Sequence, residues 1–195
     1  MAATLKARRV ILAVCGGIAA YKSAEIVSQL AQLGAEVTVV MTRTARKFVA
    51  PLTFATLSGR PVLTGTFGKT DEADPQHIAL TEQADVMLVA PATSNVIAKV
   101  AAGICDDLVT LMIAASACPV IFAPAMNNRM WENPIARANR AKLAELGYRF
   151  IGPDEGWLAC RNVGPGRLSD PAKIVSEIVA TLNQTITPPV KIQNS

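Results

Sequence analysis

The sequence is poor in aromatic residues, in charge and in histidine, and these shortages narrow the class of protein. Only 5% of its 195 residues are aromatic, 17% are charged, and there is one histidine. With so little charge and 51% hydrophobic residues, the chain has ample apolar surface to bury, which argues against intrinsic disorder. The formal charge of +4 comes from scattered basic residues, without the concentrated basic face that nucleic-acid binding needs. A small anionic ligand fits this charge balance better.

Uninterrupted hydrophobic runs that would suit a membrane are also lacking. The apolar run at 10–14 breaks at Gly16 and leads into an amphipathic pattern, unlike a signal peptide. The uncharged stretch 108–128 has the length of a membrane span, but Pro119 and Pro124 divide it. It is more typical of a buried helix followed by a buried strand. We therefore expect no membrane segment.

The four cysteines lack the paired spacing of zinc sites. They are Cys15, Cys105, Cys118 and Cys160, and His77 is the only histidine, so we expect no bound metal. Cys15 and Cys118 are expected in buried strands, where free cysteine behaves as a small hydrophobic residue. This usage fits a reducing compartment such as the cytoplasm. Cys160 differs because it lies in a glycine-rich loop.

Short apolar, β-branched runs alternate with segments of helical periodicity. Strands are expected at 10–15, 36–41, 85–90, 119–123 and 148–151, and helices at 18–33, 51–57, 94–102, 107–117, 128–146 and 172–182. From 183 onward the chain is polar and contains prolines, which indicates a loose tail. The alternation predicts a single α/β domain, a doubly wound parallel sheet in three α/β/α layers of the Rossmann-like or flavodoxin-like kind. Such sheets bind ligands beyond the carboxyl ends of their strands.

Four loops at these carboxyl ends carry the unusual residues. They are the segments 15–19, 42–44, 91–95 and 124–127. Glycines after the first strand allow a phosphate to approach backbone N–H groups at a helix N-terminus. The dinucleotide spacing G-x-G-x-x-G is missing, and hydroxyls with Arg43, in place of an acid, follow the second strand. These features favour a mononucleotide over NAD, although ordinary turn chemistry would explain any single loop.

Five motifs, taken in order, resemble the flavin-containing cysteine decarboxylases. They are Gly16–Lys22, His77, Pro91–Asn95, Pro124–Trp131 and Gly156–Arg167. The resemblance covers about residues 7–182, expected to form the flavoprotein domain, with 183–195 as the tail. It implies bound FMN, a cytoplasmic homo-oligomer (trimer or dodecamer), and no nucleic-acid or membrane partner. The last motif resembles the loop that closes over 4′-phosphopantothenoylcysteine, which members of the family convert to 4′-phosphopantetheine and CO2 in coenzyme A biosynthesis.

The resemblance also implies roles for individual residues. His77, Asn127 and Cys160 are the catalytic set: His77 handles a proton, Asn127 holds the substrate carboxylate and Cys160 donates a proton to the enethiolate. Met130 and Ala159 are expected to bind substrate beside Asn127 and Cys160. The expected flavin-binding residues are Gly16, Gly17, Ile18, Thr42, Arg43, Thr44, Thr93, Ser94, Asn95 and Ala125.

From the residues alone, simpler interpretations stay open. Asn127 could merely cap a helix, Cys160 could be an unreactive loop cysteine, and Asp106 and Asp107 are typical of a helix cap. A lone histidine is more often structural than catalytic. Alternative functions are a peptidyl-cysteine decarboxylase, a non-catalytic flavin-binding regulatory protein and a flavin prenyltransferase.

Overall fold

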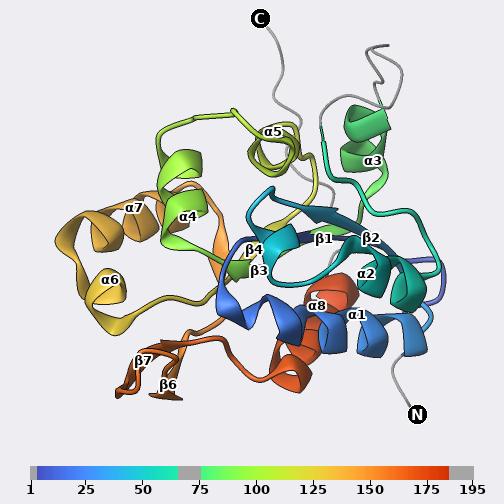
Figure 1. Cartoon of the computed structure of the whole chain (residues 1–195). Helices are drawn as coiled ribbons and strands as arrows, with labels where there is room; N and C mark the ends of the chain where they lie inside the picture. Colours follow the sequence, from blue (N-terminus) through green and yellow to red (C-terminus); the bar gives the residue numbers. More distant parts are fainter. Residues whose placement is uncertain (1–3, 66–75, 185–195) are drawn as a thin grey trace, which may run out of the picture.

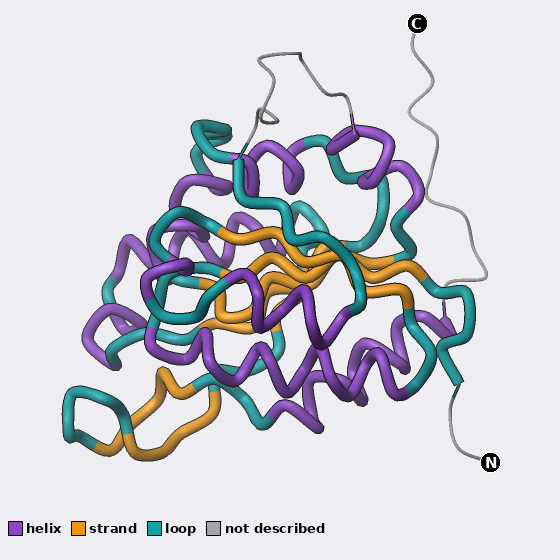
Figure 2. The backbone as a smooth tube through the Cα atoms, turned by 45° about the vertical axis from the view of Figure 1, so that its right-hand side comes forward, coloured by secondary structure: helices purple, strands orange, loops and turns teal. Residues whose placement is uncertain are grey.

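Aliphatic and β-branched runs form a central parallel sheet, seen edge-on in Figure 2. The computed structural model describes residues 4–65 and 76–184. The sheet has the strand order β2-β1-β3-β4-β5 with every pair parallel. Its strands are β1 (Arg9–Val14), β2 (Glu36–Met41), β3 (Val86–Ala92), β4 (Val120–Pro124) and β5 (Arg149–Phe150). The predicted doubly wound α/β fold is therefore confirmed.

Helices cover both faces of the sheet (Figure 1). On one face lie α1 (Lys22–Gln32), α2 (Pro51–Ser58) and α8 (Pro171–Gln184); on the other lie α3 (Gln76–Gln83), α4 (Ser94–Ala101), α5 (Leu108–Ala114) and α7 (Pro134–Glu145). Successive residues of a strand point to opposite faces, so Leu12 and Val14 pack with α1 and α8 while Ile11 and Ala13 pack with α4 and α5. This alternation divides the core into two halves.

Two expected helices are each divided in the structure. The segment 18–33 begins as the 3-10 helix η1 (Ile18–Tyr21) and continues as α1. The segment 128–146 is split into α6 (Asn128–Glu132) and α7, because Asn133 caps α7 through a hydrogen bond from the Ile135 N–H and Pro134 occupies its first turn. The last helix runs to Gln184, past the expected start of the tail at 183. Residues 185–195 lie outside the described residues.

The stretch 108–128, with the length of a membrane span, forms α5 and β4, as predicted. None of the described helices is long and apolar enough to cross a membrane. Cys15 is fully buried directly after β1. Cys118 is only half-buried, because β4 begins after it at Val120, so the expectation of a buried strand position was wrong for this residue.

The glycine-rich segment 156–167, expected as a loop, forms an antiparallel hairpin of β6 (Asp154–Trp157) and β7 (Val163–Arg167). The hairpin projects from the body of the molecule at the lower left of Figure 1. The strand β7 is held to the loop after β4, because the Met126 N–H donates a 2.9 Å hydrogen bond to the Gly166 carbonyl. The segment is therefore anchored at its base.

Candidate functional site

The predicted flavin-binding residues line one cavity at the carboxyl ends of β1, β2, β3 and β4. This first cavity has a volume of about 600 Å³, within the range of small-molecule sites. It lies where strand order reverses between β1 and β3, the position at which doubly wound sheets bind ligands. Its lining includes every residue of the predicted flavin-binding set except Ile18: Gly16, Gly17, Thr42, Arg43, Thr44, Thr93, Ser94, Asn95 and Ala125.

Close packing of two loops shapes the floor of the first cavity. A Cβ atom added to Gly16 would lie 2.4 Å from the Thr44 Cβ, so any larger residue would push apart the loops after β1 and β2. A side chain at Gly17 would meet only the Thr93 methyl group, at 3.7 Å. The glycine at position 16 is thus required by the approach of Thr44 and keeps the cavity wall at backbone level.

The hydroxyls of the first cavity are partly engaged and still able to donate. The Thr42 Oγ1 accepts a 3.2 Å hydrogen bond from the Ala45 N–H, and the Thr93 Oγ1 accepts one of 3.3 Å from the Val96 N–H at the start of α4. Each hydroxyl keeps its own O–H for a ligand. With the Arg43 guanidinium, this donor set suits a phosphate and a polyol chain.

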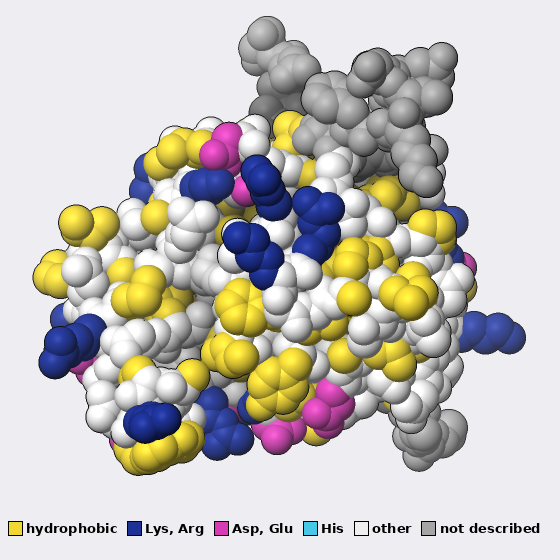
Figure 3. Space-filling view, in the orientation of Figure 1, with side chains coloured by type: hydrophobic (Ala, Val, Ile, Leu, Met, Phe, Trp, Pro, Cys, Tyr) yellow, Lys and Arg dark blue, Asp and Glu magenta, His cyan; other side chains and the backbone are white. Residues whose placement is uncertain are grey.

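Basic side chains lie next to the first cavity. Arg43 lines it, and Arg46 and Lys47 of the 3-10 helix η2 (Ala45–Lys47) are exposed beside it in sequence. Lysine and arginine side chains gather in the middle of the face drawn in Figure 3, over the region of η2 and the loop after β2 in Figure 1. The field at this side of the cavity favours an anionic ligand.

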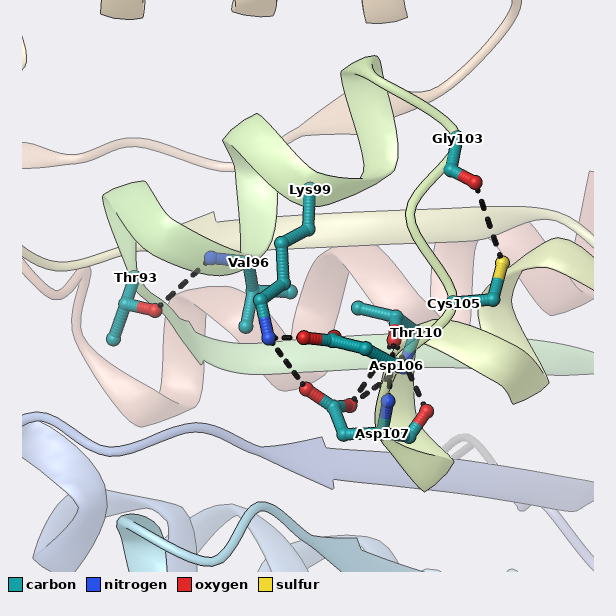
Figure 4. Close-up of polar contacts among 8 residues, drawn as sticks. All are labelled: Thr93, Val96, Lys99, Gly103, Cys105, Asp106, Asp107 and Thr110. Carbon is teal, nitrogen blue, oxygen red and sulfur yellow. Dashed lines mark hydrogen bonds and ion pairs between the residues drawn. The ribbon is translucent and has the colours of Figure 1, made fainter.

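Lys99 and Asp107 also line the first cavity, and neither was predicted to be a site residue. The Lys99 Nζ lies 2.6 Å from Asp106 and 3.1 Å from Asp107 (Figure 4). The hydrogen bond to Asp106 raises the pKa of the Lys99 ammonium, so it stays charged. A sequence signal existed: Lys99 lies four residues after Asn95, hence on the same face of α4.

Asp107 confirms the predicted helix cap. Its carboxylate accepts a 2.9 Å hydrogen bond from the Thr110 N–H, and the Thr110 hydroxyl accepts one of 3.3 Å from the Asp107 N–H. This reciprocal pair is a capping box at the start of α5. Asp107 therefore fixes α5 and Lys99 together.

A second cavity, of about 640 Å³, adjoins the first and shares Gly17, Ala125 and Met126 with it. Asn127, Ala159 and Cys160, all expected to bind substrate, line this cavity. Ile18 lines only the second cavity, whereas every other predicted flavin-binding residue lines the first. Met130, expected with the substrate residues, lines the first cavity instead.

Asn127 and Cys160 meet in the second cavity, although they are 33 residues apart. The Asn127 Nδ2 donates a 3.1 Å hydrogen bond to the Cys160 Sγ, while its Oδ1 accepts one of 2.8 Å from the Arg129 N–H. The cap interpretation of Asn127 is therefore confirmed, and it leaves the amide nitrogen free for a second contact. Cys160 is exposed near the hairpin tip.

Two further residues are placed away from this pair. Cys15 is fully buried, and burial raises its pKa to about 12, so it remains a neutral thiol and offers no nucleophile. His77 is the second residue of α3, a helix that packs on α5. The predicted catalytic role of His77 concerns a side chain outside the described part of the structure.

Comparisons with known proteins place these cavities in context. The family model described as Flavoprotein matches residues 2–183. The chain is 45% identical over 179 residues to the coenzyme A biosynthesis bifunctional protein CoaBC of Borreliella burgdorferi, covering 92% of this chain and 46% of that protein. It thus spans about half the length of such relatives. It is 44% identical to the Streptococcus mutans protein named "Probable phosphopantothenoylcysteine decarboxylase", covering 88% of this chain and 97% of that one.

The chain is also similar to solved structures, including two that match with a TM-score of 0.80. One is a PPC decarboxylase mutant complexed with pantothenoylaminoethenethiol, 31% identical, covering 90% of this chain and 98% of that one. The other is the FMN-dependent cysteine decarboxylase SpaF, 33% identical, covering 93% of this chain and 98% of that one.

Proposed function

The chain belongs to the flavoprotein family, and we propose that it binds FMN in the first cavity and decarboxylates 4′-phosphopantothenoylcysteine in the second. The products are 4′-phosphopantetheine and CO2, as in the coenzyme A pathway named for its relatives. The observation that carries the proposal is the 3.1 Å contact between Asn127 and Cys160 in a cavity that adjoins the predicted flavin site.

The first cavity fits FMN on its own chemistry. The free O–H groups of Thr42 and Thr93 and the Arg43 guanidinium suit a phosphate and a ribityl chain. Ala125, which lines both cavities, extends the lining toward the second cavity for the ring system. When bound, FMN supplies the reversible two-electron oxidation of the cysteine moiety that makes loss of CO2 easy.

The chain's own residues bind the substrate and manage its protons. The Asn127 amide, held by the cap at its Oδ1, presents its N–H to the substrate carboxylate or to the Cys160 sulfur. Cys160 gives a proton to the enethiolate left after decarboxylation, and the β6–β7 hairpin closes over the site and keeps water out. His77 takes the proton that the cysteine moiety loses.

The wider organisation follows from the same proposal. Residues 7–182, with the last turn of α8 to Gln184, are the FMN-binding domain. The protein works in the cytoplasm, which is supported by four unpaired thiols. A peptidyl-cysteine decarboxylase and a non-catalytic flavin-binding protein remain the alternatives. The presence of both Asn127 and Cys160 at one cavity favours a catalytic member.

We also propose a homo-oligomer, a trimer or dodecamer, in which two copies complete each site. In Figures 1 and 2, α3, which carries His77, and the β6–β7 hairpin lie at opposite ends of the molecule. Co-expressed His77→Asn and Cys160→Ser subunits should then regain part of the activity that each variant lacks alone. A monomer in sedimentation at micromolar concentration, or no recovery in the mixed protein, would contradict this arrangement.

The direct test of the function uses the purified protein. It should be yellow with flavin absorbance and release CO2 from 4′-phosphopantothenoylcysteine. Cys160→Ser should release CO2 once and then accumulate an enethiol two hydrogens lighter than 4′-phosphopantetheine by mass spectrometry, since a hydroxyl is a far weaker acid than a thiol. Colourless protein that rebinds no FMN would refute the proposal.

A further inference from the structure

The second cavity carries charge of one sign. Lys22 and Arg167 are the only charged side chains among its described lining residues. The remaining polar side chains of the lining come from Tyr21, Asn127, Trp157 and Cys160, and the rest is apolar or glycine. No carboxylate lines the cavity in the part of the chain that the structure describes, so the charges at its wall favour an anion.

Neither cation is engaged elsewhere. The side chains of Lys22 and Arg167 form no hydrogen bond or ion pair with another described residue, whereas those of Lys99 and Lys173 are each held by carboxylates 2.6 Å away. Lys22 is half-buried at the junction of η1 and α1. Both side chains are therefore available to a ligand.

The hairpin makes room for the Arg167 guanidinium. A Cβ atom added to Gly156, on the facing strand, would lie 3.1 Å from both the Cδ and the Nη1 of Arg167. The Arg167 side chain, although exposed, thus lies against Gly156 of β6 at the base of the hairpin. Its neighbours Gly166 and Leu168 line the same cavity, so its backbone belongs to the cavity wall.

We propose that Lys22 and Arg167 form the subsite for the 4′-phosphate of the substrate. The inference rests on the proposed function and deepens it. The cysteine end of the substrate lies at Asn127 and Cys160, the gem-dimethyl group of its pantothenoyl middle packs along Ile18 and Leu158, and its dianionic phosphate is held by the two cations. The pair selects a phosphorylated small molecule over a peptide that ends in cysteine.

The test compares two substrates that differ only in the phosphate. The wild-type protein should turn over 4′-phosphopantothenoylcysteine with a kcat/KM at least about tenfold above that for pantothenoylcysteine, as expected for charge-assisted hydrogen bonds. Arg167→Gln and Lys22→Gln should each lower kcat/KM for the phosphorylated substrate by about tenfold. For pantothenoylcysteine, kcat/KM should stay within about twofold of the wild-type value. Arg167→Lys should keep part of the preference, because the charge remains without the planar fork.

Arg161→Gln is the matched control, because Arg161 is exposed on the same hairpin and lines neither cavity. This variant should leave kcat/KM unchanged for both substrates. If Arg167→Gln and Lys22→Gln lower kcat/KM equally for both substrates, or leave the preference for the phosphorylated substrate unchanged, the subsite is overturned. So would a preference for a peptide ending in cysteine.

Calorimetry of the holoprotein with 4′-phosphopantetheine and pantetheine separates this inference from the function itself. Tighter binding of the phosphorylated compound in the wild type, lost in the two variants, supports the subsite even if neither substrate is decarboxylated. Equal binding of both compounds refutes the subsite, whereas turnover of the phosphorylated substrate alongside it would leave the proposed function standing.

Discussion

At the scale of single residues, Asn127 shows how one amide serves structure and chemistry together. Its Oδ1 caps α6, and its Nδ2 donates to the Cys160 Sγ. Asparagine and aspartate cap helices about equally well, since either supplies an acceptor oxygen. Only asparagine also has the N–H group, so the two functions of Asn127 can be separated by substitution.

Asn127→Asp should keep the thermal midpoint close to that of the wild type and abolish turnover, because a carboxylate at this position repels the substrate carboxylate. Asn127→Ala should lose the cap as well, at a cost of about 1 kcal/mol in the free energy of unfolding. Thermal melts and CO2 release on the same preparations measure both effects. Near-normal turnover in Asn127→Asp would leave Asn127 with the cap alone.

At the scale of elements, the β6–β7 hairpin depends on its contact with the loop after β4. Gly166 has a φ of 133°, and an added Cβ would lie 2.2 Å from the Met126 carbonyl oxygen. An alanine there is strained both by its backbone conformation and by this clash. The hairpin places Cys160 at Asn127 only while the two segments stay in contact.

Gly166→Ala should therefore destabilise the protein by more than about 1 kcal/mol and lower kcat/KM. Gly164→Ala is the control in the same strand: its added Cβ would meet the Asn128 side chain at an ordinary 3.5 Å. It should change stability by no more than about 0.5 kcal/mol. Urea unfolding and steady-state kinetics measure the two effects, and equal behaviour of the variants would show that the contact with Met126 is unimportant.

The start of α5 offers a second prediction at this scale. Asp107→Ala removes one half of the capping box and one partner of Lys99, and should cost about 1–2 kcal/mol in urea unfolding. Asp107→Asn keeps the cap and should recover most of that loss. Asp106→Ala leaves the box intact and should barely move the midpoint, since a surface ion pair contributes little. If Asp106→Ala is as damaging as Asp107→Ala, the ion pair matters more than the cap.

At the scale of the whole molecule, the parallel sheet gathers distant loops at one edge. Segments after β1, β2, β3 and β4 meet there because the carboxyl ends of parallel strands share that edge. The same sheet buries Cys15 completely beneath the loops. Burial raises the folded-state pKa of this thiol to about 12 from a reference of 9.0.

The stability of the folded protein should therefore fall in alkali partly through Cys15. Because the folded-state pKa is raised, its contribution is fully present below about pH 9 and is lost as the pH rises toward about 12, where the unfolded chain has already released the proton. Between pH 8 and 10 the wild type should lose about 1 kcal/mol more than Cys15→Ala in urea unfolding. If the free energies of unfolding of the wild type and of Cys15→Ala fall equally with pH, Cys15 makes no such contribution.

The pattern of apolar runs determined the fold class and the edge that holds the site, since strand and helix periodicity are local properties of the chain. Asp107 and Asn127 were predictable as caps for the same reason. The split at Asn133, the hairpin at 154–167 and the division of residues between two cavities were decided by tertiary structure. Glycine-rich segments such as 156–167 carry little local preference, so the partner at Met126 determines their conformation. Only packing in three dimensions brings Lys22 and Arg167, 145 residues apart in the printed sequence, to one cavity.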